Sequence, residues 1–489
     1  MSGASLNLLD FKNPSIRTLH FSWIAFFITF VMWFGLGPLA AFIKTEFALT
    51  EPQWKALLML NVAITIPSRI LIGMLVDKFG PRAIYAALLV ISGFICIAFA
   101  WAQDYTQLAI TRFLMGFVGA GFVIGIRLVS EWFPARNVGL AEGVYGGWGN
   151  FGSAAAAALL PLIAAAFAPT VGWRISLTGA GIISILYAFV FYHYVRNTPK
   201  GSTYFSPKKA GGLEVSSWGD LWFYYAMNIP LHLALAVLVW RLSPLNLNLL
   251  PQFWANLAYI LIAALAAIQF RQIWQVNAEH LRAGVPENQR FKFKQVSILS
   301  LSYFASFGSE IAVVSMLPIF FMDTFGLSPV QAGLSTAGFV VANLIARPGG
   351  GWMSDRIGRR KALSIQVGGL AVGYAAMSFI DSGWPLWLAI AITVANSFFV
   401  QAGCGGVYAV IPLIKRRMTG QIAGMAGAYG NVGGVIFLTV LSFVHASTFF
   451  MVIAACAAVV FFAVQFLDEP EGHMVEVLPD GTVQLIEVR

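Results

Sequence analysis

Long apolar runs recur along almost the whole chain, and this feature leaves few folds open to it. Each run has about 18 residues or more, which is the length that an α-helix needs to cross a bilayer. Only 10% of the residues are charged and 58% are hydrophobic, whereas roughly 25% of a soluble domain is charged. We therefore predict an all-α polytopic membrane protein and set aside a soluble protein with an unusually large core.

Twelve membrane helices are predicted from these runs, six on each side of a central insertion. They cover residues 20–43, 52–77, 83–102, 105–131, 137–167, 172–195, 295–322, 328–354, 361–380, 385–411, 420–443 and 445–467. The insertion holds two further apolar stretches, "LWFYYAMNIPLHLALAVLVW" and "FWANLAYILIAALAAIQF", each long enough to span. We interpret them as two extra membrane helices. The alternative is a pair of interfacial helices, which Asn228, Pro230 and His232 in the first stretch favour.

The two halves of the chain repeat each other. "ITIPSRILIGMLVDKFGPR" places Arg69 eight residues before Asp77, and "VANLIARPGGGWMSDRIGRR" places Arg347 eight residues before Asp355. Secondary transporters are commonly built from two repeated bundles, with the substrate site between them. We therefore predict an N-terminal six-helix bundle, a central insertion, a C-terminal six-helix bundle and a tail. These segments cover residues 1–195, 196–294, 295–467 and 468–489.

Basic residues gather in alternate loops. The loops near residues 78–82, 136, 356–361 and 415–417 are basic, whereas "AQDYTQ", "FIDSGW" and "VHAST" are nearly free of Lys and Arg. By the positive-inside rule, the basic loops and both termini are expected to face the cytoplasm. The net charge is +9, but the basic residues do not gather into a patch that would bind nucleic acid. We therefore expect no nucleic-acid partner. The tail sequence "MVEVLPDGTVQLIEV" predicts a small cytoplasmic hairpin, and a regulatory partner at the insertion or the tail stays open.

Two arginines lie deep in apolar helices. Eight residues from a helix end corresponds to about 12 Å, because each residue adds about 1.5 Å. An arginine in the hydrocarbon interior is costly, so it usually faces the bundle interior and marks a substrate path. Few acids lie at the depth of Arg69 and Arg347, Glu310 being the clearest. The pair therefore predicts an anionic ligand, small and planar, because guanidinium groups match planar oxyanions with parallel hydrogen bonds. A structural pair with buried carboxylates is the alternative.

Several motifs resemble those of a known family. "GMLVDKFGPR", "GWMSDRIGRR" and "RFLMGFVGAG" resemble the loop and fourth-helix motifs of the major facilitator superfamily. "GVYGGWGNFG" and "GMAGAYGNVGG" resemble the paired glycine-rich signatures of its nitrate/nitrite porter family, the NarK-type branch. The insertion, the acidic seventh helix and the tail resemble the cyanobacterial nitrate permeases of that family. The resemblance implies a major facilitator fold and a transporter of the plasma (inner) membrane. It implies no cofactor and no enzymatic activity.

The resemblance also implies roles for individual residues. Asn150 is expected to contact nitrate more directly than Asn431, whereas the glycines around both asparagines are also explained by close helix packing. The implied substrate-binding set is Arg69, Arg347, Asn150, Asn431, Tyr303, Phe122, Phe307, Phe30 and Gly146. In the loop motifs, a charge network that latches the cytoplasmic gate is expected to contain Asp77, Arg82, Asp355 and Arg359.

Glu310 decides between modes of coupling. Tyr303, Phe307 and Glu310 share one face of the predicted seventh helix, and an acid inside a membrane is a natural proton carrier. We therefore expect nitrate and nitrite import coupled to protons. A nitrate/nitrite antiporter, a porter for another small anion such as formate or oxalate, and a membrane sensor or receptor are the alternatives. An enzyme is not expected, because the sequence shows no metal cluster, nucleotide loop or nucleophile–base arrangement.

Overall fold

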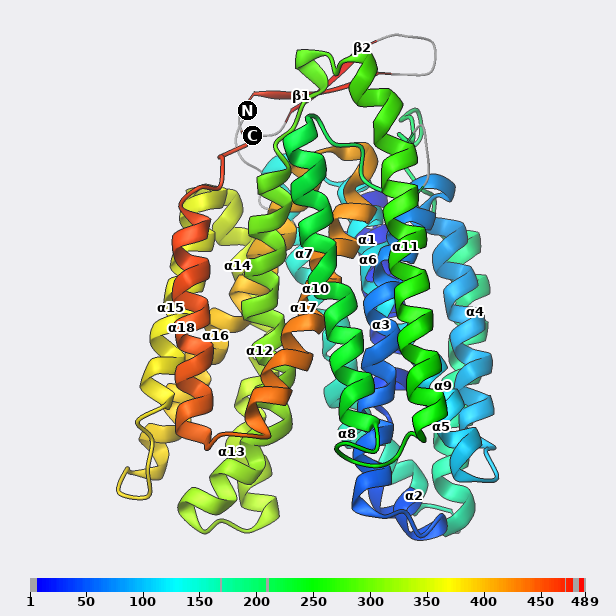
Figure 1. The fold of residues 1–489 in the computed structure, drawn as a ribbon, viewed down its shortest axis with the longest axis vertical. Coiled ribbons are helices and arrows are strands. Elements are labelled where there is room, and N and C mark those ends of the chain that lie inside the picture. Colours follow the sequence, from blue (N-terminus) through cyan, green and yellow to red (C-terminus); the bar gives the residue numbers. More distant parts are fainter. Residues whose placement is uncertain (1–6, 168, 208–210, 471, 478–482, 488–489) are drawn as a thin grey trace.

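The structure, a computed structural model, is an upright bundle of long helices (Figure 1). It describes residues 7–167, 169–207, 211–470, 472–477 and 483–487. The N-terminal half contains α1 (Pro14–Phe34), α2 (Ala40–Glu46), α3 (Glu51–Phe79), α4 (Pro81–Ala100), α5 (Tyr105–Leu114), η1 (Met115–Ala120), α6 (Gly121–Trp132), α7 (Ala135–Asn150), α8 (Gly152–Ala165) and α9 (Pro169–Tyr194). The C-terminal half contains α12 (Phe293–Phe325), α13 (Pro329–Val341), α14 (Asn343–Ile357), α15 (Arg359–Met377), α16 (Leu386–Val410), η3 (Ile411–Leu413), η4 (Arg416–Met418), α17 (Thr419–Leu441) and α18 (Ala446–Val464).

The first predicted helix is wrong in its boundaries. It was expected over residues 20–43, but α1 begins at Pro14 and ends at Phe34, and a separate short helix follows. The side chain of Asn13 accepts a hydrogen bond from the backbone N–H of Ser15 and so caps α1. Three other predicted helices are each divided: one at Phe151, one at Ala342, and the helix predicted over 105–131 by the 3-10 segment Met115–Ala120.

The two extra helices of the insertion are confirmed. α10 (Trp218–Leu242) and α11 (Gln252–Ala283) stand beside the bundles along their height (Figure 1). Within the described residues, twelve helices are long and apolar enough to cross a membrane, and both of these are among them. Asn228, which favoured the interfacial alternative, is buried and bonds to the Tyr224 carbonyl and the Gln269 side chain. Its polar atoms are therefore satisfied between helices.

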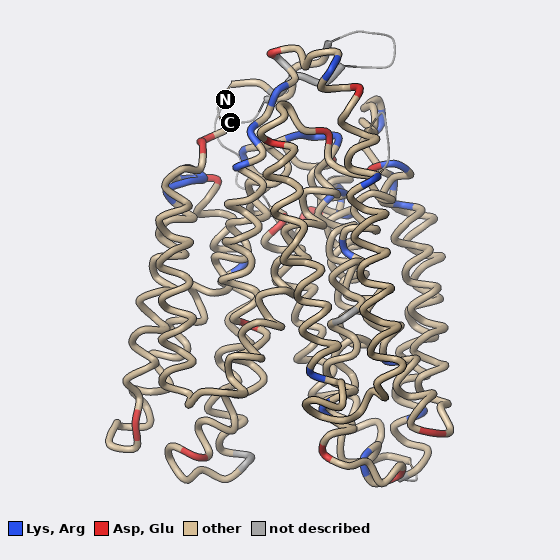
Figure 2. Tube along the Cα trace, in the orientation of Figure 1, with Lys and Arg blue, Asp and Glu red and all other residues tan. Residues whose placement is uncertain are grey.

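Charged side chains are concentrated at the two ends of the molecule. Most lysines and arginines lie at the end where α1 begins and α18 finishes (Figure 2). We call this the basic end. Its loops are those at residues 78–82, 134–137, 356–361 and 415–417.

The predicted hairpin is present in the tail. β1 (His473–Val477) pairs antiparallel with β2 (Val483–Glu487), while the expected turn at Pro479-Asp480-Gly481 lies outside the described residues. The tail is attached to the basic end through Asp468, which bonds to Lys292 and Lys294 at 3.0 Å each. Partial burial acts to raise the pKa of the Asp468 carboxyl, but the hydrogen bonds from the two lysines lower it overall.

Candidate functional site

Two stripes of glycine bring the halves into close contact. A Cβ on Gly143 of α7 would lie 2.5 Å from the carbonyl oxygen of Arg347 in α14. A Cβ on Gly424 of α17 would lie 2.4 Å from the carbonyl oxygen of Arg69 in α3. Any larger residue would push the helices apart, so the packing explanation of these glycines holds. The same contacts place each arginine-bearing helix directly against the opposite half.

The two arginines occupy matched but unequal environments. Both are buried, at 1% exposed for Arg69 and 2% for Arg347. Arg347 donates from Nε to Gln401 Oε1 at 3.0 Å and from Nη2 to Glu310 Oε2 at 2.8 Å. Among the described residues, Arg69 donates only to backbone oxygens, those of Gly119 at 3.2 Å and Gly427 at 2.7 Å. Arg347 therefore has a countercharge, whereas no carboxylate of the described residues forms a salt bridge with Arg69.

Gly146 and Gly427 make room for the guanidinium groups. A Cβ on Gly146 would lie 3.7 Å from Nη1 of Arg347, and one on Gly427 would lie 3.2 Å from Nη1 of Arg69. The predicted site residue Gly146 therefore lies next to an arginine of the other half, as its repeat partner does.

Stacked aromatic rings line the space between the arginines. The Phe307 ring centre lies 5.2 Å from the guanidinium carbon of Arg69 and 5.8 Å from that of Arg347. Tyr303 stacks on Phe307 at 4.9 Å and faces Phe122 at 6.4 Å with nearly parallel planes. Phe30 lies one ring further out, since it contacts Phe26, which in turn contacts Phe122. The structure thus brings Phe122, Tyr303 and Phe307 together next to the arginines. Phe30 lies in a second layer, separated from Phe122 by Phe26.

Glu310 joins the two halves through one carboxylate. Its Oε1 accepts hydrogen bonds from the amides of Asn150 and Asn343, both at 3.2 Å, while its Oε2 bonds to Arg347. Cys404 lies 3.9 Å from the same Oε2. The Glu310 carboxyl group is therefore held by an arginine and two amides, and any anion that binds Arg347 must compete with it.

The two asparagines of the glycine signatures differ. Asn150 reaches Glu310 of the other half, whereas Asn431 donates to Gly427, a carbonyl of its own helix that also accepts from Arg69. The Oδ1 of Asn431 has no hydrogen-bond partner among the described residues. Only Asn150 belongs to the network around Arg347.

Sequence reasoning missed three members of this site: Gln401, Asn343 and Tyr408. Asn343 precedes Arg347 by four residues, so helical spacing alone places it on the same face. Tyr408 packs edge-on against Tyr303 at 4.9 Å and Phe122 at 4.6 Å. Gln401 and Tyr408 carry no comparable sequence signal, because α16 meets the arginines only in the folded protein.

Two aspartates close the basic end across the halves. Asp77 accepts hydrogen bonds from the backbone N–H groups of Gly420 and Gln421, both at 2.8 Å. Asp355 accepts from those of Gly139 at 3.0 Å and Leu140 at 2.8 Å. We call these two contacts the latches. Each joins an arginine-bearing helix of one half to a glycine-bearing helix of the other.

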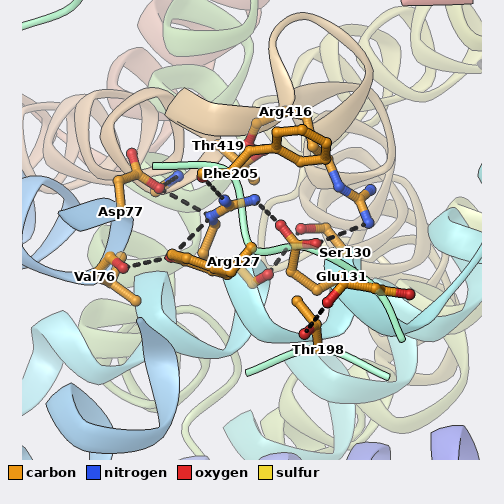
Figure 3. Close-up of polar contacts among 12 residues, drawn as sticks. Val76, Asp77, Arg127, Ser130, Glu131, Thr198, Phe205, Arg416 and Thr419 are labelled. Atoms are coloured by element: carbon orange, nitrogen blue, oxygen red, sulfur yellow. Dashed lines mark hydrogen bonds and ion pairs between the residues drawn. The ribbon is translucent and has the colours of Figure 1, made fainter. Parts of the chain in front are cut away.

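Two arginines were predicted to accompany the latch aspartates, and only one of them does so. Arg359 pairs with Asp355 and donates to the Ala135 carbonyl at 2.6 Å, so the predicted pair lies together. Arg82 does not contact Asp77 among the described contacts; its Nε donates to the Tyr192 carbonyl at 2.7 Å. Arg127 lies 3.1 Å from Asp77 instead (Figure 3).

Arg127 extends the first latch into a larger network. It pairs with Glu131, which Arg416 of the other half approaches at 3.4 Å (Figure 3). Nη2 of Arg127 also donates to the carbonyl oxygen of Phe205 at 2.7 Å, and Phe205 belongs to the linker after α9. The sequence did offer a signal for Arg127, because it stands in the apolar run "GFVIGIRLVSEW". An arginine in such a run needs a charged or polar partner.

Comparisons with known proteins agree with this architecture. The chain matches the Major Facilitator Superfamily over residues 22–276 and 299–487. It is 45% identical to the nitrate/nitrite transporter NrtP of Nostoc punctiforme, covering 93% of each chain, and 43% identical to NrtP of Picosynechococcus sp., covering 95% of each. Its fold is similar to that of the proton:xylose symporter XylE, with a TM-score of 0.63 at 17% identity, covering 94% of this chain and 97% of that one. The chain therefore belongs to the major facilitator superfamily and, within it, to the family of these cyanobacterial nitrate/nitrite transporters.

Proposed function

We propose that this protein imports nitrate, and also nitrite, across the plasma (inner) membrane by alternating access, together with protons. The observation that carries the proposal is the unequal charge balance of the arginine pair. Two buried guanidinium groups approach one aromatic ring, and the described residues supply a single bonded carboxylate, Glu310. A buried charge without a counterion is costly, so an anion between Arg69 and Arg347 would be strongly favoured.

The surroundings favour a small planar anion. Guanidinium groups present their N–H donors in one plane and match planar oxyanions with two hydrogen bonds. The nearly parallel rings of Tyr303, Phe307 and Phe122 enclose the space beside them. Nitrate and nitrite have these properties, and the similar cyanobacterial proteins are named for both.

Glu310 would couple the anion to a proton. In this conformation its carboxylate accepts a hydrogen bond from Nη2 of Arg347, so this donor is not available to an anion. Protonation of one carboxylate oxygen removes the negative charge and weakens that ion pair, so Arg347 becomes available to the anion. On the other side of the membrane the anion leaves, Glu310 releases its proton to water, and the ion pair forms again. Proton and anion thus travel in the same direction.

The latches would control access to this site. With both termini in the cytoplasm, the basic end is the cytoplasmic gate, and both aspartates hold it closed in this conformation. Release of the anion to the cytoplasm then requires that the contacts of Asp77 and Asp355 with the opposite half break together.

Uptake of labelled nitrate by proteoliposomes tests the proposal. Vesicles with an acidic outside and no internal anion should accumulate nitrate, and dissipating the pH gradient should abolish this accumulation. Uptake that ignores the gradient but requires internal nitrite would instead make the protein a nitrate/nitrite antiporter. Competition by formate or oxalate, with no effect of nitrite, would replace the substrate. Nitrate binding without any translocation would favour a sensor.

A further inference from the structure

A cavity lies away from the arginine site, between the insertion and the junction of the two halves. It has a volume of about 400 Å³, which is in the range of pockets for small ligands. Its walls come from α3 of one half, α17 of the other, and both helices of the insertion. The residues that matter below are Ile64 and Leu71 of α3, Leu265 and Ile268 of α11, and Gln421 and Met425 of α17.

One side chain in this cavity is left without partners. Gln421 is 5% exposed, and neither its side-chain oxygen nor its side-chain nitrogen has a hydrogen-bond partner among the described residues. Leaving a buried amide without hydrogen bonds is costly, so a ligand or a water is expected to bond to it. Its backbone N–H is already used by Asp77 in the first latch.

The lining of the cavity is largely apolar and includes a few polar side chains besides Gln421. Gln421 is the third residue of α17, so it lies close to the basic end, and Gln272 and the backbone of Gly212 line the same region. Ile64 lies ten residues before Met74 along α3, a depth of about 15 Å at about 1.5 Å per residue. The deep part includes Ile64, Phe117 and Leu265. Asn228 and Gln269 also line the cavity, but they bond to each other at 2.7 Å.

The mouth of the cavity faces the surface that a bilayer covers. Only 6% of the most apolar window of α11 is buried, so this helix is almost entirely exposed along its span. Ile268 is 55% exposed and Leu71 43% exposed, and these two residues bound the cavity from α11 and α3. A molecule can therefore enter sideways from the hydrocarbon region without passing the arginine site.

We infer that this cavity binds one acyl chain of an uncharged glycerolipid, whose ester or hydroxyl group bonds to Gln421. The chain fits the apolar depth, and the glycerol region of a lipid lies near the membrane surface, where Gln421 is. A neutral head group is favoured because none of the described residues that line the cavity is a lysine or an arginine. Since Gln421 also takes part in the first latch, the bound lipid supports the closed basic end.

Photolabelling of the purified full-length protein tests this inference. The probe is a palmitoyl monoacylglycerol that carries a diazirine in its chain. After illumination, label should concentrate on the cavity segments of α3, α11 and α17. Excess unlabelled monoacylglycerol should remove it, whereas the same chain on a phosphate head group should compete about tenfold less well.

Three variants make the experiment decisive. Ile268→Trp fills the mouth and should lower labelling of these segments about tenfold. Ile260→Trp is the matched control, because Ile260 is 64% exposed on the same helix but does not line the cavity. The cavity segments of this variant should be labelled as strongly as those of the wild type. Gln421→Leu keeps the volume but removes the amide, and should abolish the preference for the uncharged head group.

The inference fails if label spreads evenly over all exposed helices, or if Ile268→Trp is labelled like Ile260→Trp. Either result would mean that the cavity holds water. Because the readout is lipid attachment and not anion uptake, it is independent of the proposed transport.

Discussion

The sharpest prediction concerns the substitution Glu310→Gln. Glu310 is the carboxylate bonded to Arg347, and it also accepts from Asn150 and Asn343. Glutamine has nearly the same shape but no charge. The variant therefore mimics a permanently protonated carboxyl and leaves the Arg347 guanidinium without its countercharge.

The magnitude follows from the burial of the pair. Removing one partner of a buried ion pair costs about 3–5 kcal/mol, and Glu310 and Arg347 are 7% and 2% exposed. The anion-free variant should therefore melt at a lower temperature than the wild type. Nitrate restores the missing negative charge, and it no longer competes with a carboxylate. Its affinity should rise by up to about 100-fold, which corresponds to about 3 kcal/mol.

Two assays measure these effects. Thermal unfolding of the purified protein, with and without nitrate, should show a larger nitrate-induced stabilisation in the variant than in the wild type at neutral pH. In proteoliposomes, a pH gradient should no longer drive accumulation by the variant, while exchange of nitrate for nitrate or nitrite continues. Glu46→Gln is the matched control: Glu46 pairs with Arg174 at 2.5 Å at the end of α2, which lies at the end of the molecule opposite the basic end (Figure 1), and its loss should leave gradient-driven uptake intact.

A variant that accumulates nitrate against its gradient as the wild type does would refute this reasoning. Glu310 would then be a structural partner of Arg347, and exchange of nitrate for nitrite would become the better description. Unchanged nitrate affinity would separately contradict the competition between carboxylate and anion.

Three further predictions follow from the same geometry. Arg347→Lys and Arg69→Lys should each abolish transport without loss of folding, because each arginine donates from two nitrogens and lysine offers one; near-normal uptake by a well-folded variant would exclude that arginine from the site. Asn150→Ala should weaken nitrate binding more than Asn431→Ala, because only the Asn150 amide lies in the network around Arg347, where it can donate to nitrate once the anion displaces Glu310, and equal affinities in a competition assay would return both to a packing role. Nitrate should slow alkylation of Cys404, which adjoins Glu310, as measured by mass spectrometry with Cys456 as the internal reference; equal rates with and without nitrate would place the anion elsewhere.

Much of the architecture was readable from the sequence because membrane helices are specified by local composition. Helices lie at every position that the apolar runs predicted, including the two of the insertion, and the errors of boundary lie at ends and interruptions such as Phe34 and Ala342. The helices at 328–354 and 361–380 are not among the twelve of the described residues that are long and apolar enough to cross a membrane. The depth of Arg69 and Arg347 followed from their spacing to Asp77 and Asp355. Both are properties of a single helix and need no knowledge of its neighbours.

Which residues of different helices contact each other could not be predicted from the sequence. The sequence offered Arg82 for Asp77, yet Arg127 of another helix takes that position. It left Glu310 free to pair with either arginine, and the fold pairs it with Arg347. The periodicity of one helix states which residues share a face and how deep they lie. The rotation and approach of two helices depend on the packing of every side chain between them, down to the glycines that let α7 meet α14 and α17 meet α3. For this reason the sequence alone determined the helices, their repeat and the buried arginines, and only the tertiary structure decided which charge meets which.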